Sequence, residues 1–217
     1  MIIEEISIHN KKYPEQLKHI YNPPMKLYAI GNTDILKQKG IAIVGSRKAT
    51  EYGKKVALKI SKELSEKGFH IISGLARGID SYAHIGNINS KSTGKTIAVL
   101  GSSIDTIYPK ENRNLAIKII KTGGCILSEY PIGSKIQPKN FPERNRIISG
   151  LSKGVIIIEA SEKSGALITA DFALEQGREV FAVPGNILNE NSKGTNTLIK
   201  QGAKVVTSFQ DILEEIH

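Results

Sequence analysis

Cysteine and tryptophan are almost missing from this 217-residue chain, which has one cysteine and no tryptophan. The single cysteine, Cys125, has no partner for an internal disulfide, and a zinc site built from several thiolates is excluded. The five histidines show none of the spacings that are typical of metal ligands. The sequence therefore predicts a fold that depends on neither disulfides nor metal ions.

Long apolar runs are missing as well. No run approaches the roughly 18 residues that a membrane-spanning helix needs. Residues 1–5 lack the basic segment followed by an apolar one that is typical of a secretory signal. We therefore expect a cytoplasmic protein that has no membrane partner.

Acidic residues are outnumbered by basic ones. The chain has 30 Lys and Arg against 21 Asp and Glu, which gives a formal net charge of +9 and a pI near 9.5. A basic surface attracts polyanions, so nucleic acids, nucleotide phosphates and anionic membranes are the candidate partners. A lysine-rich surface without a binding role would give the same charge, and the charge alone does not decide between the two.

Short apolar runs alternate with longer amphipathic segments along most of the chain. In residues 52–67, for example, Val56, Ile60 and Leu64 recur at every fourth position, as on one face of a helix. Continuous apolar runs of strand length are typical of strands that are buried on both faces of a parallel sheet. The predicted strands are residues 41–44, 69–72, 96–100, 125–127, 155–158 and 180–183.

This alternation predicts an α/β fold of the extended Rossmann-like type, with a doubly wound, mostly parallel sheet and helices on both faces. Further helices are expected at residues 112–121, 141–151 and 166–176. We expect residues 1–217 to form a single domain. Its residues 1–40 should add a helix and an extra strand, residues 27–30, to the core.

Glycine, serine and arginine gather in the loops that follow the predicted strands. Ligands of open parallel sheets bind outside the carboxyl ends of the strands, where loops lead into helix N-termini. A single glycine-rich loop after a strand is explained by a tight turn. Several such loops at one edge of the sheet, two of which carry arginine, instead predict a phosphate-binding edge. The candidate residues in the first two loops are Gly45, Ser46, Arg47, Lys48, Ser73, Gly74 and Arg77.

Motifs for a bound cofactor are not found. No G-x-G-x-x-G follows the first core strand, so a dinucleotide is not expected. Residues 94–96 are similar to the end of a P-loop, but they precede a strand instead of following one. The sequence therefore predicts no cofactor.

The most basic stretch, residues 134–146, has four Lys or Arg residues against one Glu, with Phe141 among them. A single nucleic-acid strand is bound by cations that contact its phosphates and by aromatic rings that stack on its bases. The alternative is that Phe141 anchors the loop while Arg144 and Arg146 make contacts within the fold. For the two arginines the internal role is slightly favoured, and for Lys139 a contact with DNA is favoured.

Six motifs, spread over nearly the whole chain, resemble those of one family. They are residues 45–47, 73–80, 141–151, 163–170, 177–185 and 194–196. In this order they are similar to the signatures of the DNA-processing protein A (DprA/Smf) family. Some members also carry an N-terminal helical domain or a C-terminal winged-helix-like domain, and neither is expected in this sequence.

The resemblance implies a non-enzymatic protein that forms a homodimer, binds and protects incoming single-stranded DNA, and loads the RecA recombinase during natural transformation and recombination. The last helical segments, around residues 187–202 with the apolar Leu198 and Ile199, are expected to contribute to the dimer. By the pattern of the family, the DNA pocket is lined by Ser46, Arg47, Lys48, Lys139, Asn140 and Phe141.

Two other function classes stay open at this point. The family is itself similar to nucleotide-processing phosphoribohydrolases (the lysine decarboxylase-like superfamily), whose signature is P-G-G-x-G-T-x-x-E. Residues 163–169 lack the double glycine and the glutamate, and Glu159 and Glu162 lie out of register. A nucleotide-sensing module would use the same glycine-rich loops for a small phosphorylated ligand.

Overall fold

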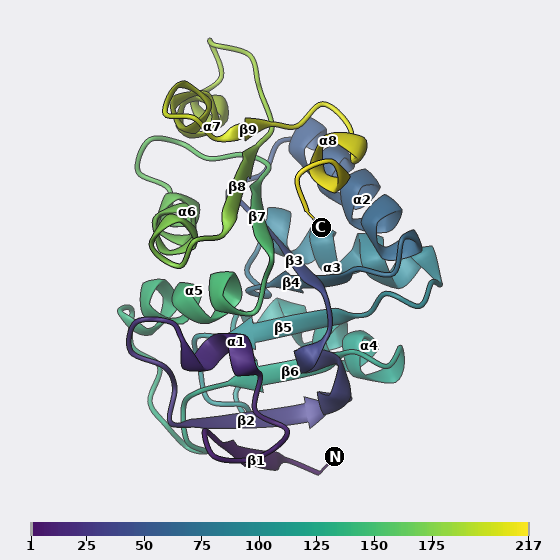
Figure 1. The fold of residues 1–217 in the computed structure, drawn as a ribbon, viewed down its shortest axis with the longest axis vertical. Coiled ribbons are helices and arrows are strands. Elements are labelled where there is room, and N and C mark those ends of the chain that lie inside the picture. Colours follow the sequence, from purple (N-terminus) through teal and green to yellow (C-terminus); the bar gives the residue numbers. More distant parts are fainter. Residues whose placement is uncertain (1, 217) are drawn as a thin grey trace.

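One sheet of nine strands runs through the computed structural model, which describes residues 2–216 (Figure 1). In chain order the strands are β1 (Glu4–Ser7), β2 (Lys26–Gly31), β3 (Gly40–Val44), β4 (His70–Ser73), β5 (Thr96–Leu100), β6 (Cys125–Ser128), β7 (Gly154–Ile157), β8 (Glu179–Ala182) and β9 (Lys204–Val205). In space their order is β1-β2-β6-β5-β4-β3-β7-β8-β9.

The sheet is parallel from β6 to β9 and antiparallel only where β2 pairs with β6 and with β1. All six predicted core strands form, and the extra strand predicted at residues 27–30 lies inside β2. The mostly parallel α/β fold is confirmed. β1 was not predicted, because Glu4 and Glu5 interrupt the apolar pattern of this four-residue strand.

Helices cover both faces of the sheet. They are α1 (Glu15–Lys18), α2 (Glu51–Glu66), α3 (Ile79–Ser90), α4 (Arg113–Lys121), α5 (Asn140–Gly150), α6 (Gly165–Glu175), α7 (Glu190–Lys200) and α8 (Gln210–Leu213), with short 3-10 helices at Thr33–Lys37 and Lys110–Asn112. No helix in residues 2–216 is long and apolar enough to cross a lipid bilayer.

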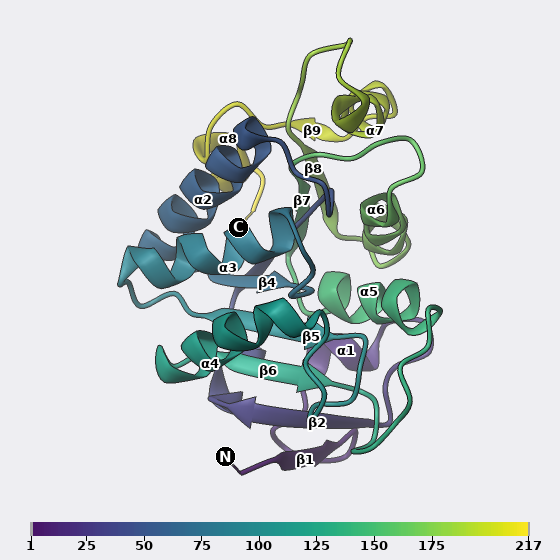
Figure 2. The ribbon, with the colours of Figure 1, turned by 180° about the vertical axis from the view of Figure 1, so that it is seen from behind.

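Each central strand sends alternate side chains to the two faces. In β3, Ala42 and Val44 join the apolar cluster under α1, α5, α6 and α7. Its other two apolar residues, Ile41 and Ile43, pack with α2, α3 and α8 on the opposite face. Helix α4 covers the same face as α3, over β5 and β6 (Figure 2). This two-sided burial explains why the core strands are continuously apolar.

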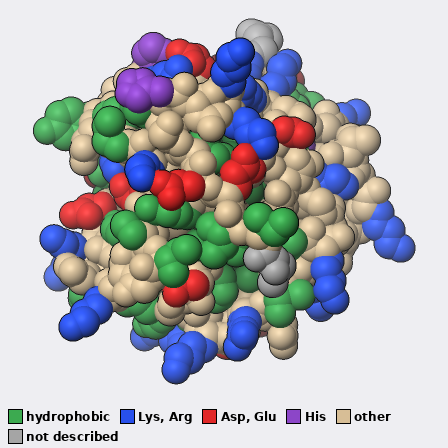
Figure 3. Space-filling view, turned by 90° about the horizontal axis from the view of Figure 1, so that it is seen from below, with side chains coloured by type: hydrophobic (Ala, Val, Ile, Leu, Met, Phe, Trp, Pro, Cys, Tyr) green, Lys and Arg blue, Asp and Glu red, His purple; other side chains and the backbone are tan. Residues whose placement is uncertain are grey.

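The outermost strand, β1, has no partner on its outer edge within residues 2–216. Glu4 forms an ion pair with Lys12 at 2.7 Å, and Glu5 forms one with Lys26 at 2.5 Å. Figure 3 looks at the molecule from this end, where a patch of hydrophobic side chains is flanked by charged ones. Charged side chains on an edge strand disfavour pairing with a strand of another chain.

Candidate functional site

A cleft of about 410 Å³ lies at the carboxyl end of β3, between β4 and β7. The chain leaves β3 for α2 on one face of the sheet and leaves β7 for α6 on the other. The loops after β3 and β7 therefore diverge and leave a crevice, which is the usual ligand site of open α/β sheets. The cleft is lined by residues 44–48, 141–148, 161–169, Ala76, Asp80 and Asn191 in part or whole.

The loop after β3 brings four of the predicted residues to this cleft, namely Gly45, Ser46, Arg47 and Lys48. The Ser46 N–H donates to the Glu159 carbonyl at 2.7 Å, and the Lys48 N–H donates to Ser46 Oγ at 3.1 Å. These bonds fix the backbone while the Arg47 and Lys48 side chains stay exposed. No carboxylate in the described part of the chain lies within ion-pair distance of either cation.

Glu159, at the end of β7, holds this loop in place. Its buried carboxylate accepts from the Thr50 backbone N–H at 2.9 Å and from the Thr50 hydroxyl. A Cβ at Gly53 would lie 2.4 Å from the same carboxylate, so the first turn of α2 passes too close for any other side chain. Glu159 therefore positions α2 and the loop before it.

Asn191, in the first turn of α7, is a cleft residue that the sequence did not reveal. Its Nδ2 donates to the Lys48 carbonyl at 2.8 Å, and its Oδ1 accepts from Ser46 Oγ at 3.3 Å. It lies 143 residues from Lys48 along the chain. No local pattern in the sequence could have indicated this contact.

Phe141, in the first turn of α5, forms one wall of the cleft. The Arg47 guanidinium carbon lies 5.7 Å from the centre of its half-buried ring. The ring of Phe141 also contacts the ring of Tyr108: the two ring centres are 5.3 Å apart and the ring planes are tilted by 48°. A cation therefore lies beside an aromatic ring, so that one nucleotide could place its phosphate on Arg47 and its base on Phe141.

Arg144 lies at the floor of the cleft with only 4% of its surface exposed. Its Nη1 donates to the Gly74 carbonyl at 2.8 Å and to the Val99 carbonyl, so it joins α5 to the ends of β4 and β5. A Cβ at Gly74 would lie 2.6 Å from the guanidinium. Burial lowers the pKa of Arg144 to about 10, while the charge of Asp80 opposes this shift. The geometry favours the same internal role that the sequence slightly favoured.

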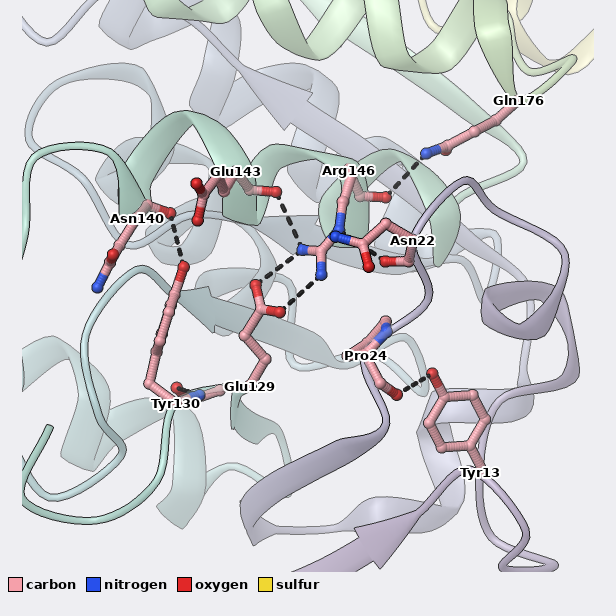
Figure 4. Close-up of polar contacts among 10 residues, drawn as sticks. Tyr13, Asn22, Pro24, Glu129, Tyr130, Asn140, Glu143, Arg146 and Gln176 are labelled. Atoms are coloured by element: carbon pink, nitrogen blue, oxygen red, sulfur yellow. Dashed lines mark hydrogen bonds and ion pairs between the residues drawn. The ribbon is translucent and has the colours of Figure 1, made fainter.

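Arg146 is likewise engaged within the fold (Figure 4). Its two terminal nitrogens donate to the two carboxylate oxygens of Glu129 at 2.7 and 2.6 Å, and its Nε donates to the Asn22 carbonyl at 3.0 Å. The Tyr130 hydroxyl donates to the Asn140 carbonyl nearby, at 3.3 Å. These bonds tie the N-terminal segment and the end of β6 to α5, which carries Phe141.

The other predicted residues lie around the cleft without lining it. Ser73 is buried and its hydroxyl donates to the Ile43 carbonyl at 2.7 Å. Asn140 is buried at the start of α5, and Lys139, one residue earlier, is exposed. Arg77 and Gly74 line a smaller adjoining hollow.

The structure thus brings together Gly45, Ser46, Arg47, Lys48, Phe141 and Arg144 at one cleft. As DNA contacts, all the candidate residues stay predictions. In residues 2–216 no three side chains of the His, Cys, Asp and Glu types gather as a metal site would need.

Comparison with protein families finds one model, described as DNA recombination-mediator protein A, which matches residues 4–217. The DNA processing protein DprA of Bacillus subtilis is 50% identical over 215 residues, which cover 99% of this chain and 71% of that protein. The DprA protein of Streptococcus pneumoniae is 46% identical over 209 residues, which cover 96% of this chain and 73% of that protein.

Solved structures of the same kind superpose over almost the whole chain. The X-ray structure of DprA from Streptococcus pneumoniae has a TM-score of 0.92 at 44% identity, covering 99% of this chain and 75% of that one. DprA from Helicobacter pylori, described with its single-stranded DNA binding mode, has a TM-score of 0.86 at 32% identity and covers 99% and 98%. A molybdenum cofactor binding protein from Rippkaea orientalis, at 18% identity and a TM-score of 0.56, shares the fold alone.

The burial of Arg144 and the exposure of Arg47 generate a prediction about stability. Arg144→Ala should lower the free energy of unfolding by about 3–5 kcal/mol, because it leaves two carbonyls and the buried Asp80 without their cation. Arg47→Ala should change it by no more than about 0.5 kcal/mol. Urea unfolding followed by circular dichroism measures both, and equal midpoints for the two variants would refute the structural role of Arg144.

Proposed function

This chain belongs to the DNA recombination-mediator protein A (DprA/Smf) family, and on that premise we propose that it binds single-stranded DNA in the cleft beside β3. The observation that carries the proposal is that two exposed cations, Arg47 and Lys48, with no carboxylate partner among residues 2–216, share one cleft with the ring of Phe141. We place this activity in the bacterial cytoplasm.

The charge of the cleft supports an anionic ligand. Its lining includes three basic residues, Arg47, Lys48 and Arg144, against one acidic residue, Asp80. Asp80 is buried and accepts from the Gly74 and Ala76 N–H groups at 3.0 and 3.4 Å, so its carboxylate is engaged. The start of α6 also lines the cleft, and the positive end of a helix dipole favours a phosphate.

The aromatic wall supports a single strand rather than a duplex. Bases can stack on Phe141 only when they are not stacked inside a double helix, and stacking tolerates any base. Nothing at the cleft offers a recognition helix for a major groove. We therefore expect binding with little sequence preference, with the exposed Lys139 at the start of α5 adding a further cation.

We also propose that the protein binds DNA without enzymatic activity. The carboxylate of Glu159 is held by Thr50, and Glu162 does not line the cleft, so neither is placed to act on a ribose. To test for phosphoribohydrolase activity, the protein is incubated with nucleoside monophosphates and the release of free base is measured by chromatography. A steady release that requires the intact cleft would favour the phosphoribohydrolase alternative.

Substitution of the cations tests the DNA site. Losing a charge-assisted phosphate contact should weaken oligo(dT) binding by about 1.5–3 kcal/mol in Arg47→Ala and in Lys139→Ala. Lys62→Ala, on the exposed face of α2, should cost far less because salt screens charges beyond roughly 8–10 Å. If about three to five phosphates are neutralised, log affinity should fall with log salt at a slope of roughly −2 to −4.

Fluorescence anisotropy of labelled oligo(dT), after each variant is shown to fold, measures these affinities. Equal losses in all three variants would mean diffuse electrostatic binding and would remove the site from the cleft. Equal or tighter binding of blunt duplex of the same length would contradict the preference for single strands.

A homodimer through α6 and α7 is a second part of the proposal. Of the two residues that suggested this surface, Leu198 is buried and Ile199 is partly buried against the core, so they offer little exposed apolar surface. Three other apolar side chains of the region are exposed: Ile187 (81%), Leu188 (87%) and Leu174 (62%). A groove of about 410 Å³ lies between the two helices.

Light scattering at about tens of micromolar protein should give the mass of a dimer. Leu174→Glu should shift the protein toward monomer, because it would bury a carboxylate in an apolar contact. Tyr52→Glu, at an exposed side chain on α2, is the matched control and should leave the mass unchanged. A monomeric parent protein would remove this part of the proposal.

Loading of the RecA recombinase in natural transformation, which the family resemblance implies, completes the proposal. The protein should speed RecA-dependent strand pairing, and Arg47→Ala should reduce this effect together with its DNA affinity. Unchanged RecA kinetics in the presence of protein that binds DNA normally would contradict it.

A further inference from the structure

A second, smaller hollow adjoins the cleft at Phe141. It shares Arg47, Ala76, Phe141 and Arg144 with the cleft, and it adds residues from two other loops. These are Gly74 and Arg77 after β4, and Tyr108 and Pro109 after β5. A strand lying against Phe141 in the cleft would therefore reach this hollow with its next nucleotide.

Tyr108 offers an aromatic surface there that the sequence did not reveal. Its side chain is 45% exposed and its ring touches that of Phe141, with centres 5.3 Å apart and planes tilted by 48°. A base can lie between two rings only where they are parallel and face each other across a gap as thick as the base. These rings are tilted by 48° and touch, so no base lies between them, and each ring offers its own face to one of two neighbouring bases.

Arg77 supplies a cation at the same hollow. Its Nε is paired with the carboxylate of Glu111, and both side chains are largely exposed, 64% and 50% respectively. The bond to Arg77 holds the pKa of Glu111 below its usual value. An ion pair this exposed contributes little to stability, and a phosphate accepts a guanidinium at least as well. Glu111 is therefore an exchangeable partner for Arg77.

We propose that Tyr108 and Arg77 form a second nucleotide subsite, in which Glu111 holds the guanidinium until a phosphate of the bound strand replaces it. The ligand is the phosphodiester-linked neighbour of the nucleotide on Phe141. The inference rests on the proposed function, because it needs a single strand in the cleft. It adds a base-stacking residue, and a carboxylate that weakens binding, to that site.

Two substitutions with opposite effects test the subsite. Tyr108→Leu should weaken oligo(dT) binding by roughly five- to a hundredfold through lost stacking, and Tyr108→Phe should restore it. Glu111→Gln should tighten binding by roughly two- to fivefold, because Arg77 no longer has a competing carboxylate. The same change should steepen the salt dependence by about 0.7 in log–log slope, the value for one phosphate on a single strand.

Matched controls are Tyr52→Leu, which removes another exposed tyrosine, and Glu51→Gln, which removes the exposed partner of Lys54. All variants are first compared by urea unfolding. If Tyr108→Leu or Glu111→Gln binds as its control does, while Arg47→Ala is weakened, the subsite is overturned and the proposed function stands. If the unsubstituted protein does not bind oligo(dT), the proposed function itself fails.

Discussion

The buried guanidinium of Arg144 is the contact on which the geometry of the cleft depends. It joins α5 to the carbonyls that end β4 and β5, and α5 carries Phe141 in its first turn. Gly74 has to be glycine for this contact, because any Cβ would meet the guanidinium. Without it, the aromatic wall would lose its fixed position relative to the loop that carries Arg47.

Burial divides the charged residues into two groups with different tasks. Glu159 and Arg146 are buried or nearly so and have their hydrogen bonds made within the fold, where an unpaired charge would be costly. Arg47, Lys48 and Lys139 are exposed and have no carboxylate partner in residues 2–216. The net charge of +9 becomes informative only when these unpaired cations are found at one edge of the sheet.

The core strands could be predicted because burial on both faces leaves a continuous apolar run that is visible in the sequence. The loops at the carboxyl edge followed from the same pattern. Which candidate residues are exposed could not be predicted, since Ser73 and Arg144 match the motifs as well as Arg47 does, yet both are buried. A motif records residue identity, and burial depends on packing partners far along the chain.

Contacts between segments that are distant along the chain could not be predicted from the sequence either. Asn191 meets Lys48 across the mouth of the cleft, and Tyr108 meets Phe141 from another loop, without any local signal for either. Helix α3 escaped detection because its buried side chains include Asp80, His84 and Asn87, which blur the apolar periodicity. Asp80 lines the cleft, whereas His84 and Asn87 make hydrogen bonds with Thr96, Ser65 and Gly94 in the interior, away from it.

A structure determined with a short bound oligo(dT) would show where the DNA lies. We expect a phosphate within hydrogen-bonding distance of the Arg47 guanidinium and a thymine ring against Phe141, in the cleft beside β3. A strand bound on another face of the molecule, with the cleft free of DNA, would contradict it.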